Sequence, residues 1–307
     1  MNILYVNTRT PNCGAHVMGL NLWRVLEQSA KHTYKYSQPD SLGEMFELCK
    51  QHEATAMFVN YLGLDQPWYD VKAVRRSGLK QFAFVSHGYD ADDFDARFVP
   101  DPSGEQNGKT FPVGRPLPAF TKKTRTSNGR PVIGTAGHLL PHKKFDRMVQ
   151  RVIDEFDSAH IRILMGRADF APYQLPDEEL CRDLVAKCGK DITIEILREN
   201  MPPPQLVDWL ADHDLNVYLY DEAAQGNGFP AIAPDAGLAA RRPIAVGDVS
   251  GQSTMRLFAL CQPSVSLTDS SLKIIMANGI APLAPVYDRC SDIRVLEDME
   301  SAMENSQ

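Results

Sequence analysis

The feature that most constrains the fold is an alternation of short apolar runs and helical patterns. Apolar runs at 3–6, near Tyr34, at 56–59 and at 82–85 are separated by helical patterns at 14–29, 41–52 and about 71–76. This β-α-β order favours a parallel sheet with right-handed crossovers. The pattern stops at 88–130, where five prolines stand among polar residues. We interpret that stretch as an ordered loop and an interdomain connection.

The alternation restarts after this break. Apolar runs at 132–135, 161–165, 192–196, 215–220 and 244–246 alternate with helical patterns at 142–156, 177–187, 204–212 and 232–240, and further helices are predicted near 253–260, 270–278 and 291–304. The fold class is therefore α/β, with two tandem Rossmann-like doubly wound parallel-sheet domains at 1–125 and 126–307. Ligands of such sheets bind at the carboxyl ends of the strands, so we expect a cleft between the two domains.

Composition narrows the class of protein. A chain of 307 residues suits two domains. A net charge of −7 and a pI of about 5.6 do not favour nucleic-acid binding by bulk charge. We expect no transmembrane segment, because no apolar run approaches the roughly 18 residues required. The N-terminus is interpreted as a buried strand and not as a signal peptide. The six cysteines lack metal-site spacing, which favours reduced thiols in a cytoplasm.

The segment PVIGTAGHLLPHKKFDRMV, at 131–149, is the most informative. Its order of strand, glycine-rich turn and helix directs backbone N–H groups and a helix N-terminus toward an anion. Lys143 and Lys144 stand at the helix start, where cations are unfavourable unless an anion neutralises them. The alternative is an ordinary βα turn with solvated lysines.

This segment resembles the phosphate-binding turn of the group 1, or family 4, glycosyltransferases, G-R-L-x-P-x-K-G-x-D, which have the GT-B fold. Five positions match in register, namely Gly137, Leu139, Pro141, Lys143 and Asp146. His138 replaces the arginine, and Lys144 replaces the following glycine. The resemblance implies that Lys143, with His138 beside it, neutralises the diphosphate of a nucleotide-sugar donor at this turn, and that Gly137 lies against that donor.

A second segment, at 218–246, resembles the stretch in which the same family carries two glutamates. Asn227 and Asp235 occupy those positions, beside a turn made of Gly226, Gly228 and Phe229. The resemblance implies that Asn227 contacts the transferred sugar and that Asp235 binds the ribose hydroxyls. It also implies that Leu197 and Arg198 lie beside the base. One extra residue stands between Asp235 and Pro243, and Arg241 or Arg242 stands where glycine is usual.

In the first domain, NCGAHVMGLNLW resembles the glycine-rich entry to the family's first helix. Gly14, His16 and Gly19 are its candidate ligand contacts; the alternative is that His16 is a local helix cap. His87 follows an apolar run, where it is as well suited to a site as to a structural role. The acidic pair at 90 and 92 matches a metal-binding pattern, but we interpret that loop as solvated and expect no metal and no cofactor.

The implied function is metal-independent transfer of a sugar from a nucleotide diphosphate sugar, with a UDP-sugar favoured, to an acceptor hydroxyl. The short chain, with CG-x-H near its start and RRPIAV near its end, resembles virus-encoded glycosyltransferases, which implies a host cytoplasm. No motif identifies the acceptor; the short chain leaves room for a glycan, a protein or a hydroxymethylated base in DNA, and the acidic pI weighs against DNA. Two alternatives stay open: a nucleotide-sugar-binding protein that has lost transfer, and a nucleotide-sugar epimerase of the same fold. The motifs of dinucleotide oxidoreductases, P-loop kinases and serine hydrolases are absent from the sequence.

Overall fold

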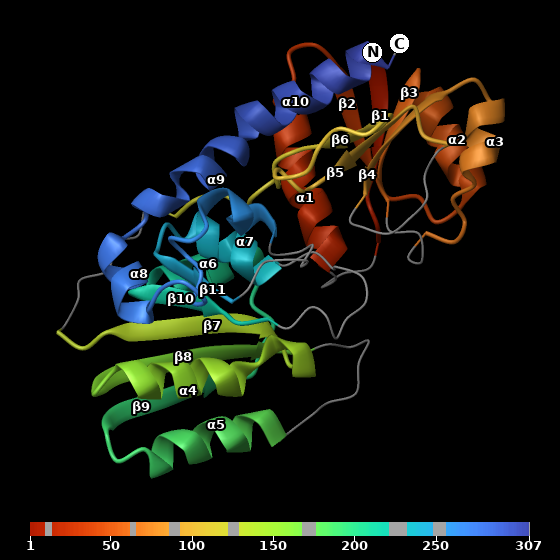
Figure 1. Cartoon of the computed structure of the whole chain (residues 1–307). Coiled ribbons are helices and arrows are strands. Elements are labelled where there is room, and N and C mark those ends of the chain that lie inside the picture. The colour runs from red at the N-terminus through yellow and green to blue at the C-terminus, as the bar shows by residue number, and fades with distance from the viewer. Residues whose placement is uncertain are drawn as a thin grey trace. The chain divides into compact units, whose positions relative to one another are not determined.

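A computed structural model describes residues 1–9, 14–61, 66–85, 93–121, 129–167, 176–220, 232–247 and 256–306. The chain forms two compact units (Figure 1). The first unit consists of residues 1–117 together with 288–307, and the second unit consists of the described residues of 118–287. Each unit is built around one parallel sheet, which confirms the predicted fold class.

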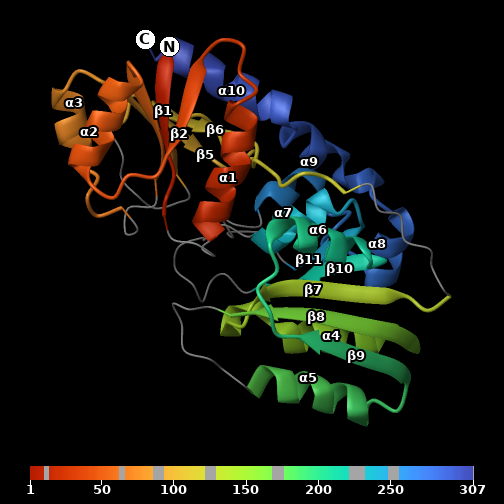
Figure 2. The ribbon, with the colours of Figure 1, turned by 180° about the vertical axis from the view of Figure 1, so that it is seen from behind.

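The first unit contains a six-stranded sheet in the order β2-β1-β3-β4-β5-β6. Its strands are β1 (Asn2–Val6), β2 (Thr33–Ser37), β3 (Ala56–Tyr61), β4 (Lys80–Val85), β5 (Ala96–Val99) and β6 (Thr110–Pro112). On one face, side chains of α1 (Gly14–Leu26) and α10 (Asp292–Asn305) pack into one core. The other face is covered by α2 (Leu42–Gln51) and α3 (Val71–Arg76), as Figure 2 shows.

Strands β5 and β6 correct the interpretation of 88–130 as loop and connection. Ala96 and Phe98 are buried in β5, which pairs in parallel with β4 and β6. The strand was missed because buried and partly exposed positions alternate over only four residues, too short a pattern to recognise. The rings of Phe98 and Phe58 stack at 5.4 Å, so this strand extends the core of the first unit.

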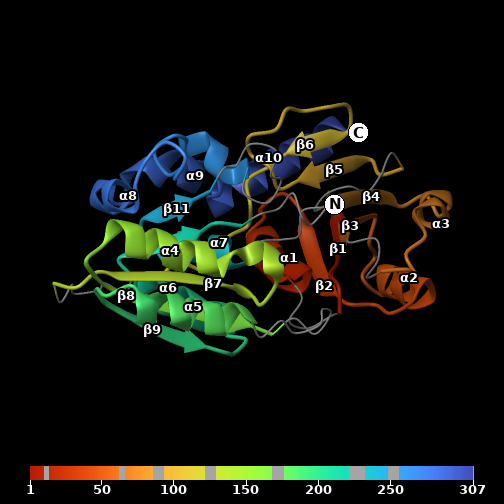
Figure 3. The same ribbon diagram turned by 60° about the horizontal axis from the view of Figure 1, so that its bottom comes forward.

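The second unit contains a five-stranded sheet in the order β11-β10-β7-β8-β9. Figure 3 shows β7, β8 and β9 of this sheet side by side. Its strands are β7 (Val132–His138), β8 (Ser158–Gly166), β9 (Asp191–Leu197), β10 (Leu215–Tyr218) and β11 (Ile244–Val246). Its helices are the 3-10 helix η2 (Pro141–Lys143), α4 (Phe145–Glu155), α5 (Pro176–Lys187), α6 (Pro203–Ala211), α7 (Ile232–Ala239), the 3-10 helix η4 (Arg256–Cys261), α8 (Leu272–Asn278) and the 3-10 helix η5 (Ala281–Leu283), followed by α9 (Ala284–Arg289). Side chains of α4, α5 and α8 form one core with the sheet.

The last helix, α10, belongs to a different unit from the one predicted. The predicted second domain, 126–307, included it, whereas α10 packs on the sheet of the first unit. Val295, Met299 and Met303 are fully buried there, at helical spacing. Arg24 of α1 donates to Asp292 at 2.9 Å, so an ion pair accompanies the apolar contact. The amphipathic pattern predicted this helix, but periodicity does not identify the sheet that a helix covers.

Among the described residues, no helix is long and apolar enough to cross a membrane.

The packing of α10 leads to a test. Met299→Ala should lower the free energy of unfolding of the first unit by about 2–4 kcal/mol, because it leaves a cavity in a closed core. Ile293 lies on the same helix with 70% of its surface exposed, so Ile293→Ala should change that free energy by less than about 0.5 kcal/mol. Both changes in unfolding free energy are measured by chemical denaturation in which hydrogen exchange of β1 and β5 reports the unfolding of the first unit. Equal effects of the two substitutions would contradict the assigned packing.

Candidate functional site

The second sheet has its topological switch point at β7. From β7 the chain runs to β8 and β9 on one side of the sheet, and later to β10 and β11 on the other. In open α/β sheets the carboxyl ends of strands at such a point form the ligand-binding crevice. Gly137 and His138 end β7, and Tyr220 follows β10 by two residues. The predicted phosphate turn therefore stands where this fold binds ligands.

Lys143 is held at this switch point by an aromatic ring. Its Nζ atom lies 3.6 Å from the centroid of the Tyr220 ring. The Tyr220 hydroxyl donates to the Ala136 carbonyl at 2.6 Å, which fixes the ring against β7. The backbone N–H of Lys143 donates to Leu140 at 2.9 Å within the short turn. A cation over an aromatic face keeps its charge and its direction, so Lys143 is positioned to meet an anion.

The sequence did not single out Tyr220. The signal that could have identified Tyr220 is its place just after β10, a buried strand that lies next to β7 on the side away from β8. That signal becomes visible only when the strand order is known.

Gly137 is a position where a side chain would be tightly packed. A Cβ atom there would lie 3.1 Å from the Tyr220 hydroxyl oxygen and 3.4 Å from Cδ of Lys143. A larger residue would therefore require these two side chains to shift by a few tenths of an ångström. The glycine keeps the backbone of the turn open to close approach by a ligand.

His138 is oriented by a backbone carbonyl. Its Nδ1 atom lies 3.0 Å from the Arg167 carbonyl oxygen, which only accepts, so Nδ1 carries the hydrogen. In the neutral ring Nε2 is then an acceptor, and it donates to an anion only when the ring is protonated. Asn200, which sequence reasoning missed, binds both the N–H and the carbonyl of Arg167, at 2.7 and 3.2 Å. Asn200 thereby fixes the carbonyl that orients His138.

Asp235 lies in the first turn of α7 and is 4% exposed. The Tyr218 hydroxyl donates to the Ala233 carbonyl at 2.9 Å in the same turn. Burial raises the pKa of Tyr218 well above its usual value, and the nearby Tyr220 and Asp235 raise it further. The rings of Tyr218 and Tyr220 lie 5.7 Å apart. These two tyrosines connect Lys143 to the start of α7, where the helix dipole favours a carboxylate.

Leu197 and Arg198 lie at the carboxyl end of β9, the edge strand beyond β8. The Arg198 guanidinium forms an ion pair with Glu178 in the first turn of α5. Glu178 also pairs with Arg182 at 2.9 Å. Burial raises the pKa of Glu178, but hydrogen bonds from Arg182 and Arg198 outweigh that effect and lower it. The structure thus places these two residues two strands away from Lys143, on the same edge of the sheet.

The first unit has a separate polar cluster at its own switch point, where β1 lies between β2 and β3. The Asn60 amide donates to Asn7 Oδ1 at 2.8 Å and to the Ala15 carbonyl at 2.8 Å. A Cβ on Gly19 would lie 1.9 Å from Asn7 Oδ1, so glycine lets α1 rest directly on this pair. Asn7 and Asn60 were not predicted, although each ends or follows an apolar strand.

His16 lies in the first turn of α1, which begins at Gly14. Its Nδ1 donates to the Thr8 carbonyl at 2.8 Å, which leaves Nε2 as the basic nitrogen of the neutral ring. Gln38 donates to the same carbonyl at 2.8 Å and fixes its position. The histidine is therefore oriented by a loop and is not a cap of its own helix.

Several predicted residues lie outside the described part of the chain. They are His87, Gly226, Asn227, Gly228 and Phe229, together with the acidic pair at 90 and 92.

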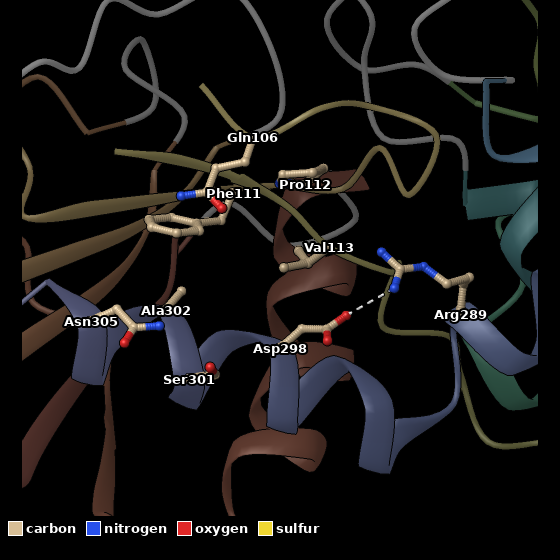
Figure 4. A pocket seen from close by; sticks show the side chains of 9 residues that line it. All are labelled: Gln106, Phe111, Pro112, Val113, Arg289, Asp298, Ser301, Ala302 and Asn305. Carbon is tan, nitrogen blue, oxygen red and sulfur yellow. Dashed lines mark ion pairs between the residues drawn. The ribbon is translucent and has the colours of Figure 1, made fainter. Parts of the chain in front are cut away.

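A shallow hollow of about 240 Å³ lies between β6 and α10 and contains none of the predicted residues (Figure 4). Arg289 and Asp298 form an ion pair of 3.3 Å in it. Nowhere in the described ranges do three His, Cys, Asp or Glu side chains come together in a group that could hold a metal ion.

Comparison with known proteins identifies the fold. No family model matches the chain, and no curated protein matches it. Solved structures do match along the whole length. The apo form of the lipopolysaccharide outer core galactosyltransferase WaaB has a TM-score of 0.62 at 13% identity, covering 100% of both chains. Anabaena HepE in complex with UDP and glucose has a TM-score of 0.56 at 12% identity, covering 99% of this chain and 100% of that one. An α-glucosyltransferase in complex with UDP and a 13-mer DNA that contains an HMU base has a TM-score of 0.59 at 8% identity, covering 99% of each.

These proteins are glycosyltransferases of the GT-B fold. The chain therefore has the GT-B fold, and the predicted resemblance in architecture is confirmed.

The phosphate turn contains one further buried group, His142, which is 5% exposed. Its Nε2 is buried without a hydrogen-bond partner among the described residues. Burial lowers the pKa of His142 to about 3, and the charges of Lys143, Lys144 and His138 also lower it. The ring is therefore neutral and forms part of the floor of the turn.

This burial predicts a pH dependence of stability. In the unfolded chain His142 binds a proton near pH 6.5, but in the folded protein only near pH 3, so the unfolded state gains protons first as the pH falls. The stabilisation is complete above pH 6.5, decreases by up to about 1.4 kcal/mol per pH unit below it, and is lost below about pH 3. His142→Gln should remove this slope in urea unfolding between pH 7 and 5. A variant whose pH dependence parallels that of the wild type would contradict the assignment.

Proposed function

We propose that this protein is a glycosyltransferase that moves a sugar from a nucleotide diphosphate sugar, with a UDP-sugar favoured, to an acceptor hydroxyl without a metal ion. The observation that carries the proposal is Lys143 held over the Tyr220 ring at the switch point of the second sheet. A positioned ammonium at a glycine turn matches the charge of a diphosphate. The fold shared with glycosyltransferases adds support.

In the proposed reaction the bond between the anomeric carbon and the diphosphate oxygen breaks, and negative charge grows on the leaving UDP. Lys143 stabilises that charge, which is usually the largest single contribution to catalysis. His138 adds a second donor when its ring is protonated. Asp235 accepts hydrogen bonds from the ribose hydroxyls, the base lies beside Leu197 and Arg198, and Asn227 in the turn of Gly226, Gly228 and Phe229 contacts the transferred sugar.

The acceptor hydroxyl loses its proton as the new glycosidic bond forms. If the outcome is inversion, His16 is a suitable base, because the Thr8 carbonyl accepts from Nδ1–H and leaves Nε2 as the basic nitrogen. His87 is the second candidate base. If the outcome is retention, no dedicated base is required, and the leaving diphosphate takes the proton.

For the acceptor we favour a glycan over DNA. Residues 1–117 and 288–307 contain 14 Lys and Arg against 19 Asp and Glu, a net charge of −5. A polyanion would be repelled by that unit, whereas a neutral saccharide would not. Transfer to glucosylated oligosaccharides but not to duplex DNA with hydroxymethylated bases, at 50 mM salt, is the expected result. Transfer to the DNA alone would contradict this part of the proposal.

Two other functions make different predictions. A binding protein that has lost transfer would be stabilised by UDP-sugars and would show neither hydrolysis nor transfer with any acceptor. An epimerase would convert the donor sugar with no acceptor present. Incubation with labelled UDP-glucose, UDP-galactose and UDP-N-acetylglucosamine, analysed for free sugar, transferred sugar and isomerised donor, separates the three.

Lys143 provides the decisive substitution. Lys143→Ala should lower kcat/KM for donor hydrolysis or transfer about 100-fold, because it removes the charge that stabilises the leaving group. Lys144→Ala is the matched control, since it removes a neighbouring lysine that begins α4 with a left-handed backbone (φ 49°). Its effect should stay within about fivefold, because a solvated charge is screened. Thermal shifts with UDP should follow the same order. If UDP stabilises Lys143→Ala as much as the wild type, the donor site lies elsewhere.

A further inference from the structure

Within the described residues, the chain passes between the two units at 117–118 and at 287–288. On the second unit's side, each crossing is accompanied by an aromatic residue, Phe120 in one and Tyr287 in the other. The guanidinium carbon of Arg241 lies 4.0 Å from the centroid of each ring. One arginine thus stacks against both crossings, although the two rings are far apart in the sequence.

The backbone of Arg241 is unusual. Its φ is +56°, in the left-handed region that favours glycine. It directly follows the last turn of α7, and its N–H donates to the Leu238 carbonyl at 3.0 Å. A non-glycine residue keeps such a conformation where surrounding contacts require it. Here the planar guanidinium, which stacks on aromatic faces better than an ammonium does, supplies those contacts.

Hydrogen bonds attach the same two crossings to the same end of α7. The Thr121 N–H donates to the Ala239 carbonyl at 3.2 Å, and the Tyr287 hydroxyl donates to the Leu238 carbonyl at 3.1 Å. The last carbonyls of a helix lack partners within it, so the Thr121 N–H satisfies the Ala239 carbonyl. The Tyr287 hydroxyl is a second donor to the Leu238 carbonyl, which also accepts from the Arg241 N–H. Both crossings are therefore fixed to one helix end by charge, ring stacking and hydrogen bonds.

A second arginine does the same on the first unit's side. Arg24 of α1 donates to the Leu117 carbonyl at 2.7 Å and to Asp292 at 2.9 Å, one partner from each crossing segment. The two segments also touch directly, since a Cβ on Gly114 would lie 1.8 Å from the Arg289 carbonyl oxygen. The two crossing segments are thus in contact with each other inside the first unit.

We propose that Arg24 and Arg241 anchor the two crossings as one hinge, and that Arg241 is a positioning residue for the donor site. Bending is confined to the few residues between the anchors, after Leu117 and after Tyr287. The eight-residue helix α7 has Asp235 in its first turn and Arg241 just beyond its end, so it connects the hinge to the position proposed for the ribose. This second step rests on the proposed function, whereas the anchoring does not.

Hydrogen exchange of the full chain tests the anchoring without any ligand. Arg241→Asn removes the guanidinium but keeps a residue that tolerates the left-handed backbone. It should speed exchange at 119–121 and at 286–291 together, by about five- to tenfold, as expected for the loss of two exposed cation–π contacts. Lys144→Asn is the control: it also replaces a basic residue by asparagine at a left-handed position (φ 49°), and it should leave the exchange rates of both segments unchanged. Faster exchange in only one segment, in neither, or equally throughout β7 and β8 would overturn the anchor.

UDP then tests the connection through α7. In the wild type, UDP should slow exchange in both crossing segments, and in Arg241→Asn this protection should be lost while the Kd for UDP stays within about threefold. With a sugar donor, kcat should fall and KM should change little, because Arg241 acts through α7 and is not itself a proposed donor contact. Unchanged protection in Arg241→Asn would overturn the coupling. Failure of UDP to bind the wild type would instead overturn the proposed function. The hydrogen exchange measured without ligand would then still test the anchoring by Arg241.

Discussion

The turn after β7 in the second unit is organised around the contact between the Lys143 ammonium and the Tyr220 ring. A lysine at the beginning of a helix is repelled by the helix dipole, so a lysine in that place needs another interaction that stabilises its charge. The face of the Tyr220 ring stabilises this cation, and the bond from Tyr220 to the Ala136 carbonyl fixes the ring against β7. The cation is thereby pre-organised, and little freedom remains to be lost when an anion arrives.

The same contact explains why neighbouring positions carry the residues they do. Gly137 lets Tyr220 and Lys143 approach the backbone closely, since a Cβ atom there would lie 3.1 Å from the Tyr220 hydroxyl oxygen and 3.4 Å from Cδ of Lys143. Tyr218 lies beside Tyr220 and reaches the first turn of α7, so the carbonyl of Ala233 and the carboxylate of Asp235 are placed relative to the same strand pair. The phosphate side and the proposed ribose side are thus parts of one packed group, and a change at either is expected to affect the other.

Much of this architecture was predictable because it is local. A parallel sheet buried on both faces is visible as apolar runs, and the glycine turn at Gly137 has its own spacing. What escaped prediction depends on contacts between distant residues. Tyr220 matters because β10 lies beside β7, Asn200 because it fixes the carbonyl that orients His138, and α10 because its apolar stripe covers the first sheet. Periodicity identifies the face of an element but not its partner.

The insertion near Arg241 shows how a departure from a family pattern acquires meaning from the structure. Compared with the pattern that the sequence resembles, one extra residue stands between Asp235 and Pro243. Arg241, one of the two arginines in this stretch, has a positive φ just beyond α7. A glycine would satisfy the backbone at lower conformational cost, but it would leave Phe120 and Tyr287 without the cation between them. The backbone is therefore strained at Arg241, just beyond the C-terminal end of α7. The contacts obtained in return join both crossings to the helix that carries the proposed ribose ligand, so the altered length after Asp235 and the stacked arginine are best understood as one feature.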